Sequence, residues 1–411
     1  MSRVNNKGRR ITVVLLLGAL LLVTGSPLSA FFEDLGRDAR ARGMANSIIA
    51  LYGNVHSMQY NPAGTAHAKN LELNLIWGKP ITMGELNDGT SFTGINGTIL
   101  MPFTNGVNTS WLIRWLFHAL TFGNEAFMFK DGAMGVSFDY RDNAGLATET
   151  MITLNYAKIL DDVLFKGAKL SAGVNFDFYL LGITKTEDAS VNPYIKDYSK
   201  LSFGMDLGFI YNFSDTLTLA VVFENLVKPN FSVTGSEDYS PMNVKFGGSI
   251  YFNKLLFFED LTINAMYVTY GKYDPMDNTV SKTSYHFGFE SWWFKRHFGF
   301  RGGLMLGDDE NSELSTGVTM LLPLGDHFLS VDYAFTLPFG VEGYRHILAL
   351  TWKWEQPKYR FEYDKKKAAE MRRIAELEAK QRQQAAGGGS DTKGDDKKSD
   401  DKKVDDLKKT K

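Results

Sequence analysis

Between about residues 71 and 356, stretches of about ten residues alternate apolar and polar side chains and are separated by turn residues. In residues 169–180 the apolar positions recur at every second residue, namely Leu170, Ala172, Val174, Phe176, Phe178 and Leu180. A period of two predicts a β-strand with one apolar and one polar face. A long series of such strands is typical of a transmembrane β-barrel.

The alternation predicts fourteen strands, an even number as expected for a single-chain bacterial barrel. They are expected at residues 71–79, 91–103, 131–141, 148–160, 168–182, 200–213, 216–227, 241–253, 260–271, 280–293, 297–307, 314–324, 327–338 and 345–356. Their apolar faces would contact lipid. The opposite faces predict a polar lumen, because they carry Asp177, Asp206, Glu224, Lys245, His286, Glu290, Arg301, Asp332 and Lys353.

Turn lengths predict the orientation, because such barrels have short periplasmic turns and longer external loops. The connections 212–215, 295–296 and 325–326 are short and polar, whereas 184–200 and 227–240 are longer. Both ends of the barrel chain are therefore expected in the periplasm, and the protein is expected in the outer membrane of a diderm bacterium.

One connection is long on the predicted periplasmic side. Residues 104–130 contain Trp111, Trp115 and Phe117 at spacings that predict an amphipathic helix. These three residues are candidate contacts for an apolar ligand. The helix could instead lie on the membrane surface, fold into the lumen, or cover the barrel mouth, and a miscounted strand would place it outside.

The first thirty residues predict a secretory signal peptide, because four basic residues precede an apolar run at residues 11–23 that is too short to span a membrane. No later apolar run approaches 18 residues, so no transmembrane helix is expected. The chain contains no cysteine, which excludes a disulfide framework and a thiolate metal site.

The segment between the signal and the first strand carries two linked motifs. It reads ARARGM from residue 39 and YNPAGTA from residue 60. This pair resembles the N-terminal signature of the FadL-like long-chain fatty acid transporters and of the PorV/PorQ outer-membrane proteins. The matching positions are Ala39, Arg40, Ala41, Gly43, Met44, Asn61, Pro62, Ala63 and Gly64.

The resemblance implies a fourteen-stranded barrel whose residues 31–70 fold back inside as a plug, with the Asn-Pro-Ala element in the lumen. A barrel of this width leaves space that wall side chains do not fill. Pro62 makes its turn rigid and Gly64 would permit close approach to the wall. Arg37, Arg40 and Arg42 could pair with acidic lumen residues or remain solvated.

After Gln356 the composition changes. Residues 364–385 are rich in Ala, Glu, Lys and Arg and predict a helix, and the repeated DDKK pattern beyond residue 387 predicts disorder. We expect residues 357–411 to form a periplasmic tail, either solvated or bound to a periplasmic partner.

Catalytic patterns are scarce. The seven histidines show no zinc spacing, and neither a nucleophile elbow nor a phosphate-binding loop occurs. No enzyme activity, cofactor, metal or nucleic-acid partner is expected, and His286 is interpreted as a structural residue.

Three functions remain open at this stage. The first is a plug-gated outer-membrane channel for hydrophobic small molecules such as long-chain fatty acids, which the resemblance favours. The second is a PorV-like component of protein secretion or surface attachment. The third is an outer-membrane hydrolase.

Overall fold

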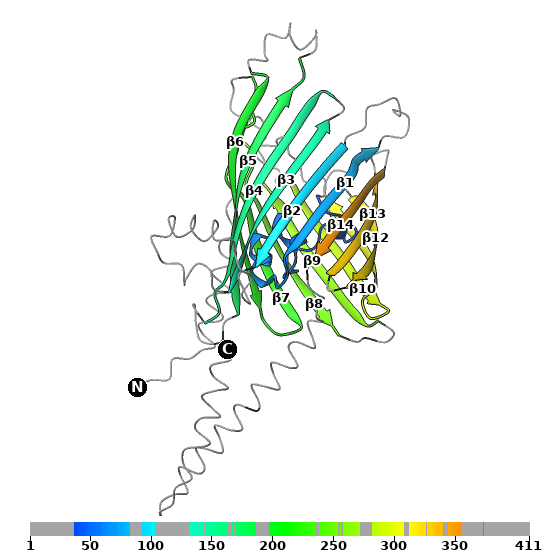
Figure 1. Cartoon of the computed structure of the whole chain (residues 1–411). Coiled ribbons are helices and arrows are strands. Elements are labelled where there is room, and N and C mark those ends of the chain that lie inside the picture. The colour runs from blue at the N-terminus through cyan, green and yellow to red at the C-terminus, as the bar shows by residue number, and fades with distance from the viewer. Residues whose placement is uncertain are drawn as a thin grey trace, which may run out of the picture. The chain divides into compact units, whose positions relative to one another are not determined.

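A computed structural model describes residues 37–82, 93–102, 131–143, 145–162, 167, 169–185, 197–234, 238–253, 255, 258–271, 282–307, 312–325, 327–339, 344–354 and 373. In this part of the chain, fourteen antiparallel strands form a closed barrel, in which sequence neighbours pair and β1 pairs with β14 (Figure 1). The predicted fold class is confirmed. The predicted signal peptide, the 104–130 insertion and the tail, apart from Arg373, lie outside the described residues.

The strand boundaries agree with the alternation to within three residues. The strands are β1 Glu72–Thr82, β2 Thr93–Pro102, β3 Gly132–Asn143, β4 Ala147–Ile159, β5 Leu170–Ile183, β6 Ser199–Asn212, β7 Leu217–Val227, β8 Asn243–Phe252, β9 Asp260–Tyr270, β10 Lys282–Trp293, β11 Phe298–Gly307, β12 Ser312–Leu324, β13 His327–Phe339 and β14 Tyr344–Lys353. The agreement is close because a period of two leaves little freedom in register once one face must be apolar.

The two ends of the barrel differ in their connections. At the end where β1 begins and β14 ends, here the terminal end, β6 joins β7 through residues 213–216 and β10 joins β11 through residues 294–297. At the opposite, loop end, β5 joins β6 through residues 184–198 and β7 joins β8 through residues 228–242. The β3–β4, β11–β12 and β13–β14 connections are short exceptions at the loop end, and the β2–β3 connection, residues 103–131, is a long exception at the terminal end.

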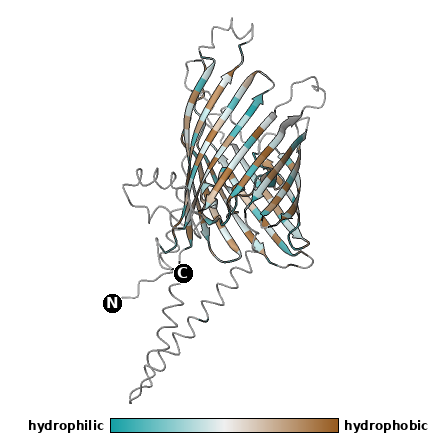
Figure 2. Cartoon of the chain, viewed as in Figure 1, coloured by the Kyte–Doolittle hydropathy of each residue, from teal (hydrophilic) through white to brown (hydrophobic). Residues whose placement is uncertain are grey.

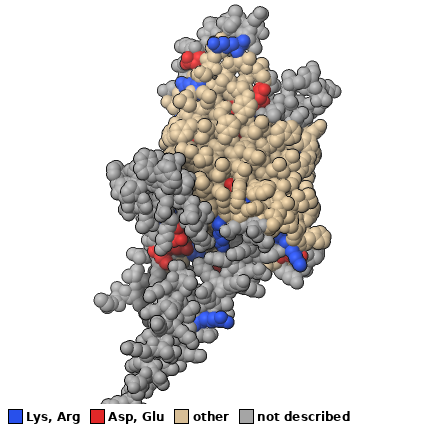
Figure 3. Space-filling model, in the orientation of Figure 1, with Lys and Arg blue, Asp and Glu red and all other residues tan. Residues whose placement is uncertain are grey.

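The outer face of the barrel is apolar. Leu75, Trp77 and Phe287 are 51%, 49% and 47% exposed, although each belongs to a strand whose alternate residues are buried. Figure 2 shows apolar positions along the strands, and Figure 3 shows charged side chains towards the ends of the barrel and few over its middle. Such a surface is stable against hydrocarbon rather than water.

The described part of the N-terminal segment, residues 37–70, lies inside the barrel (Figure 1). We call it the inner segment. It contains the short helix α2 (Ala39–Arg42) and the 3-10 helices η2 (Val55–Gln59) and η3 (Pro62–His67). No helix in the described residues is long and apolar enough to cross a membrane.

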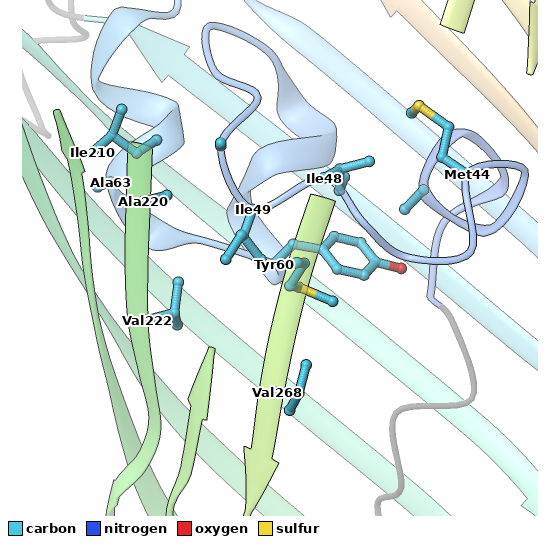
Figure 4. Packing of buried hydrophobic residues seen from close by; sticks show 12 residues of the cluster. Met44, Ile48, Ile49, Tyr60, Ala63, Ile210, Ala220, Val222 and Val268 are labelled. Carbon is cyan, nitrogen blue, oxygen red and sulfur yellow. The ribbon is translucent and has the colours of Figure 1, made fainter. Parts of the chain in front are cut away.

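Apolar side chains of the inner segment pack against the inner wall of β6 to β9. Ile48, Ile49 and Tyr60 are at most 2% exposed and belong to one cluster with Ile210 and Val268 of the wall (Figure 4). Full burial of a large apolar side chain stabilises by about 1.5–3 kcal/mol. The inner segment therefore belongs to the folded core of the barrel.

Candidate functional site

The Asn61 side chain fixes the Asn-Pro-Ala element within the inner segment. Asn61 is extended, as the residue before a proline favours, and its side chain caps η3 by accepting from the Ala63 amide at 3.0 Å. The Asn61 amide nitrogen also donates to the Ile49 carbonyl at 2.7 Å. The motif thus joins two parts of the inner segment.

Gly64 allows close packing within the inner segment. A Cβ at this position would lie 2.6 Å from Cβ of Ser57 and 3.0 Å from the Leu51 carbonyl. A side chain here would therefore collide with η2 and the preceding loop, and the predicted close approach of Gly64 to the wall stays a prediction.

Two paired glycines of the wall receive the Asn-Pro-Ala element. Gly173 of β5 and Gly208 of β6 lie opposite each other in the sheet. A Cβ at Gly208 would lie 2.1 Å from Asn61 Oδ1, and a Cβ at Gly173 would lie 2.4 Å from the Pro62 carbonyl. The main chain of the inner segment can rest here only because both wall positions lack a side chain.

A second glycine pair receives the Gly43-Met44 part of the inner segment. Gly288 of β10 and Gly303 of β11 are also paired. A Cβ at Gly303 would lie 2.3 Å from the Met44 carbonyl carbon, and one at Gly288 would lie 2.3 Å from Ser47 Oγ. Gly43 itself faces Gly317 of β12: a Cβ at Gly43 would lie 3.0 Å from the Gly317 Cα.

Neutral side chains attach η3 to β4 and β5. Thr65 Oγ1 donates to Asn155 Oδ1 at 2.7 Å, and the Asn155 amide donates to Asn175 Oδ1 at 2.8 Å. The Asn175 amide then donates to the Met58 carbonyl at 3.0 Å. This chain of hydrogen bonds leads from the inner segment to the wall and back, and all its side chains are buried.

Charged side chains attach α2 to the opposite half of the wall. Arg40 makes a two-pronged contact with Glu290 of β10, at 2.9 and 2.6 Å. Glu290 also accepts from Arg301 of β11 at 2.7 Å, and Arg301 donates to Asp332 of β13 at 2.9 Å. These four residues form a buried alternating series of charges, which offsets the cost of removing each charge from water.

Arg42 is buried beside a second carboxylate. Its Nη2 lies 2.5 Å from Glu313 Oε2, and Arg345 of β14 donates to the same oxygen at 2.9 Å. The sequence predicts that this strand begins at residue 314, which would leave Glu313 in the preceding loop. The structure corrects this, because β12 begins at Ser312, two residues earlier, and Glu313 is a buried residue of the strand.

Asp38 begins α2 and links it to η2 and β1. Its carboxylate accepts from the Ala41 amide at 3.0 Å, the His56 imidazole at 2.6 Å and the Asn74 amide at 3.1 Å. Burial alone would raise the pKa of Asp38, but His56, the Ala41 amide and the charge of Arg301 lower it to about 2. Sequence reasoning missed this residue, since nothing in its local pattern distinguishes it from a solvated helix cap.

The other predicted lumen residues lie nearer the loop end. Asp177, Asp206, Glu224 and Lys245 occupy the inner wall of β5 to β8, and Lys245 forms an ion pair with Glu224. Arg37 of the inner segment interacts electrostatically with Asp177. The four wall residues form a separate group of charges.

The remaining candidates have simpler positions. His286 bonds to Ser284 at 2.7 Å and to the Ala45 carbonyl at 2.6 Å, which agrees with its structural interpretation. Within the described ranges, no group of three or more metal-ligating side chains occurs. Trp111, Trp115 and Phe117 fall outside the described residues.

A solved structure of low sequence identity shares this fold, and two others are similar to the chain over most of its length. The "CymD monoaromatic hydrocarbon channel" is 13% identical with a TM-score of 0.51, covering 80% of this chain and 99% of that chain. The Pseudomonas putida toluene transporter TodX (12% identity, TM-score 0.43) and a Pseudomonas aeruginosa FadL homologue (12%, 0.44) each cover 81% of this chain and 100% of their own. No curated protein matches the sequence.

A family model gives a more specific result. The model described as "Type IX secretion system membrane protein PorP/SprF" matches residues 118–337, which extend from before β3 into β13. The match covers more than half of the 411 residues. The chain therefore belongs to the PorP/SprF family of type IX secretion system membrane proteins.

Proposed function

We propose that this protein is an outer-membrane component of type IX secretion, in which the barrel serves as a membrane anchor for other parts of the machinery. The observation that carries the proposal is the fastening of the inner segment to both halves of the wall. Buried ion pairs attach it to β10, and hydrogen-bonded amides attach it to β4 and β5. A lumen occupied in this way suits an anchor better than an open pore.

Family membership supports the same role, and the turn lengths support an orientation. The short turns at the terminal end suit the periplasmic side, which would place both ends of the barrel chain in the periplasm. Residues 357–411 would then be available to a periplasmic partner. This orientation and the partner of the tail are part of the proposal.

A deletion strain tests this function. Secretion of a type IX cargo protein should fall in the deletion strain and return with the full chain. A chain ending at residue 356 should reach the outer membrane but restore less secretion, because it lacks the proposed partner-binding tail. Normal cargo secretion in the deletion strain would refute the proposed role.

A second candidate is plug-gated passage of hydrophobic small molecules such as long-chain fatty acids, and one irregularity in the wall favours it. Between β6 and β7 the register shifts from Met205 opposite Val227 to Leu207 opposite Phe223. Asn225 has a φ of 52° there, and its amide donates to the Asp206 carboxylate at 2.8 Å instead of to the ladder. This weakened pairing would be the exit of a molecule that leaves sideways into the membrane.

The pairings among the early strands are less suitable for such an exit. β1 pairs with β2, β2 with β3 and β3 with β4 without a register shift across Gly94, Gly97 and Gly135, although β1 shifts register against β14 between Lys79 and Thr82. Passage is tested with labelled palmitate and vesicles containing the purified protein. Uptake equal to that of empty vesicles would exclude this second candidate.

A further inference from the structure

Three carboxyl groups gather on the inner wall, on the loop-end side of the inner segment. They belong to Asp177 of β5, Asp206 of β6 and Glu224 of β7, and they lie near enough to one another to interact through their charges. In the sheet, Asp206 pairs with Asn175, one inward position from Asp177. Gly173 and Gly208, the glycine pair that contacts Asn61 and Pro62, lie next to these carboxyl groups on the side of the terminal end.

These carboxyl groups have fewer hydrogen-bond donors than oxygen atoms. Among the described residues, their donors are the Thr153 hydroxyl, the Asn225 backbone amide, the Asn243 side-chain amide and the Lys245 ammonium group, and the Asp177 and Asp206 side chains also hydrogen-bond to each other. Asp177 is only 2% exposed, and its Oδ2 has no hydrogen-bond partner among the described residues. A buried carboxylate oxygen without a donor is costly unless a further donor arrives.

The cations of the neighbourhood are already engaged. Arg37 lies 3.8 Å from Asp139, and Arg141 lies 3.4 Å from the same carboxylate. Lys245 pairs with Glu224. Among the described residues, the opposite half of the lumen pairs Arg40, Arg42, Arg301 and Arg345 with Glu290, Glu313 and Asp332. Here the carboxyl groups of Asp139, Asp177, Asp206 and Glu224 outnumber Arg37, Arg141 and Lys245.

A buried apolar cluster adjoins the carboxyl groups. Tyr179 follows Asp177 by one inward position on β5, and its ring packs edge-on against Phe231 with centroids 5.2 Å apart. Met151 and Leu181 belong to the same cluster. Phe231 lies in the β7–β8 connection, so a loop-end segment forms part of this cluster.

We propose that Asp177, Asp206 and Glu224 form a binding site for an organic ammonium ion whose apolar part packs beside Tyr179 and Phe231. An ammonium group brings three donors and one positive charge, which are what these carboxyl groups lack. Asp206 and Glu224 are only partly buried and can meet a ligand from the lumen. A fatty acid anion would be repelled. The site goes beyond the proposed role in secretion and does not depend on it.

Titration calorimetry on the full chain in a non-ionic detergent tests the site. The probes are phenethylamine, neutral 2-phenylethanol and anionic phenylacetate, which share an aromatic ring. We expect phenethylamine to bind more tightly than either of the others, and its affinity to fall as salt rises. The variant D206N/E224Q should weaken phenethylamine binding by about tenfold or more and leave 2-phenylethanol unchanged.

The control variant is D215N/E259Q, which removes two carboxylates from exposed positions at the terminal end and should bind phenethylamine like the unmodified protein. Heat-dependent migration in gels shows whether each variant is folded, and E224Q alone replaces the double variant if the latter does not fold. Equal affinity for phenethylamine and 2-phenylethanol would overturn the proposal. So would full phenethylamine affinity in a folded D206N/E224Q or E224Q variant.

Discussion

The ion pair between Arg40 and Glu290 offers a direct test of how the inner segment is held. The variant R40Q removes two charge-assisted hydrogen bonds, of 2.9 and 2.6 Å. Glu290 keeps Arg301 as a partner at 2.7 Å, so the carboxylate is not left without a counter-charge. We therefore expect a net loss of about 2 kcal/mol in the attachment, below the cost of a fully unpaired buried charge.

This loss can be measured with a single engineered thiol. The chain has no cysteine, so A50C introduces the sole thiol, at a position that is 1% exposed in the packed inner segment. Its labelling rate by a maleimide reports how often the segment leaves the wall. A change of about 2 kcal/mol corresponds to about thirtyfold faster labelling in R40Q.

The matched control is K169Q, which breaks an ion pair at the barrel surface. Lys169 and Asp215 are 55% and 75% exposed, so this pair should contribute almost nothing. If R40Q labels no faster than K169Q while both proteins are folded, the ion pair does not hold the inner segment in place.

Three further predictions concern stability, measured as the temperature at which the folded gel band disappears. G208A should lower this temperature and cost about 2 kcal/mol of stability, because the new Cβ would lie 2.1 Å from Asn61 Oδ1. The control G97A, on the outer face, should change the temperature little, because its Cβ would make only an ordinary van der Waals contact. E313Q should also lower it, because its two arginine partners would lose their shared counter-charge. Since the pKa of Asp38 is lowered to about 2, its contribution of about 2 kcal/mol is present above about pH 4 and is lost as pH falls towards 2. D38N should flatten that decline, and a decline as steep as that of the unmodified protein would refute the assignment to Asp38.

Much of the barrel follows from the sequence because its signal is local and repeated. The strand from Leu170 to Ile183 could be recognised from its own alternation, and the same rule placed Glu290, Arg301 and Asp332 on the inner face. Pro62 likewise predicted a rigid turn, whereas the place of that turn inside the barrel was implied by the family resemblance. Each of these inferences needs only near neighbours in the chain.

The residues that these side chains contact in the folded barrel could not be predicted from the sequence. Arg40 pairs with Glu290, which lies 250 residues away in the sequence. Asn61 contacts Gly208 of β6, and nothing in the Asn-Pro-Ala motif indicates which strand it will contact. Nothing local distinguished the wall glycines that receive main chain from those that only relieve crowding. Glu313 was misplaced because one extra pair of residues extends β12 beyond the predicted start.

The sequence by itself therefore determined the barrel, its strand count and which side chains face inward, because alternation and the cost of burying charge in lipid act residue by residue. Only the tertiary structure decided which glycines seat the inner segment, which arginine meets which carboxylate, and where carboxyl groups remain in excess. Barrel closure and strand register set those contacts, and both depend on the whole chain at once.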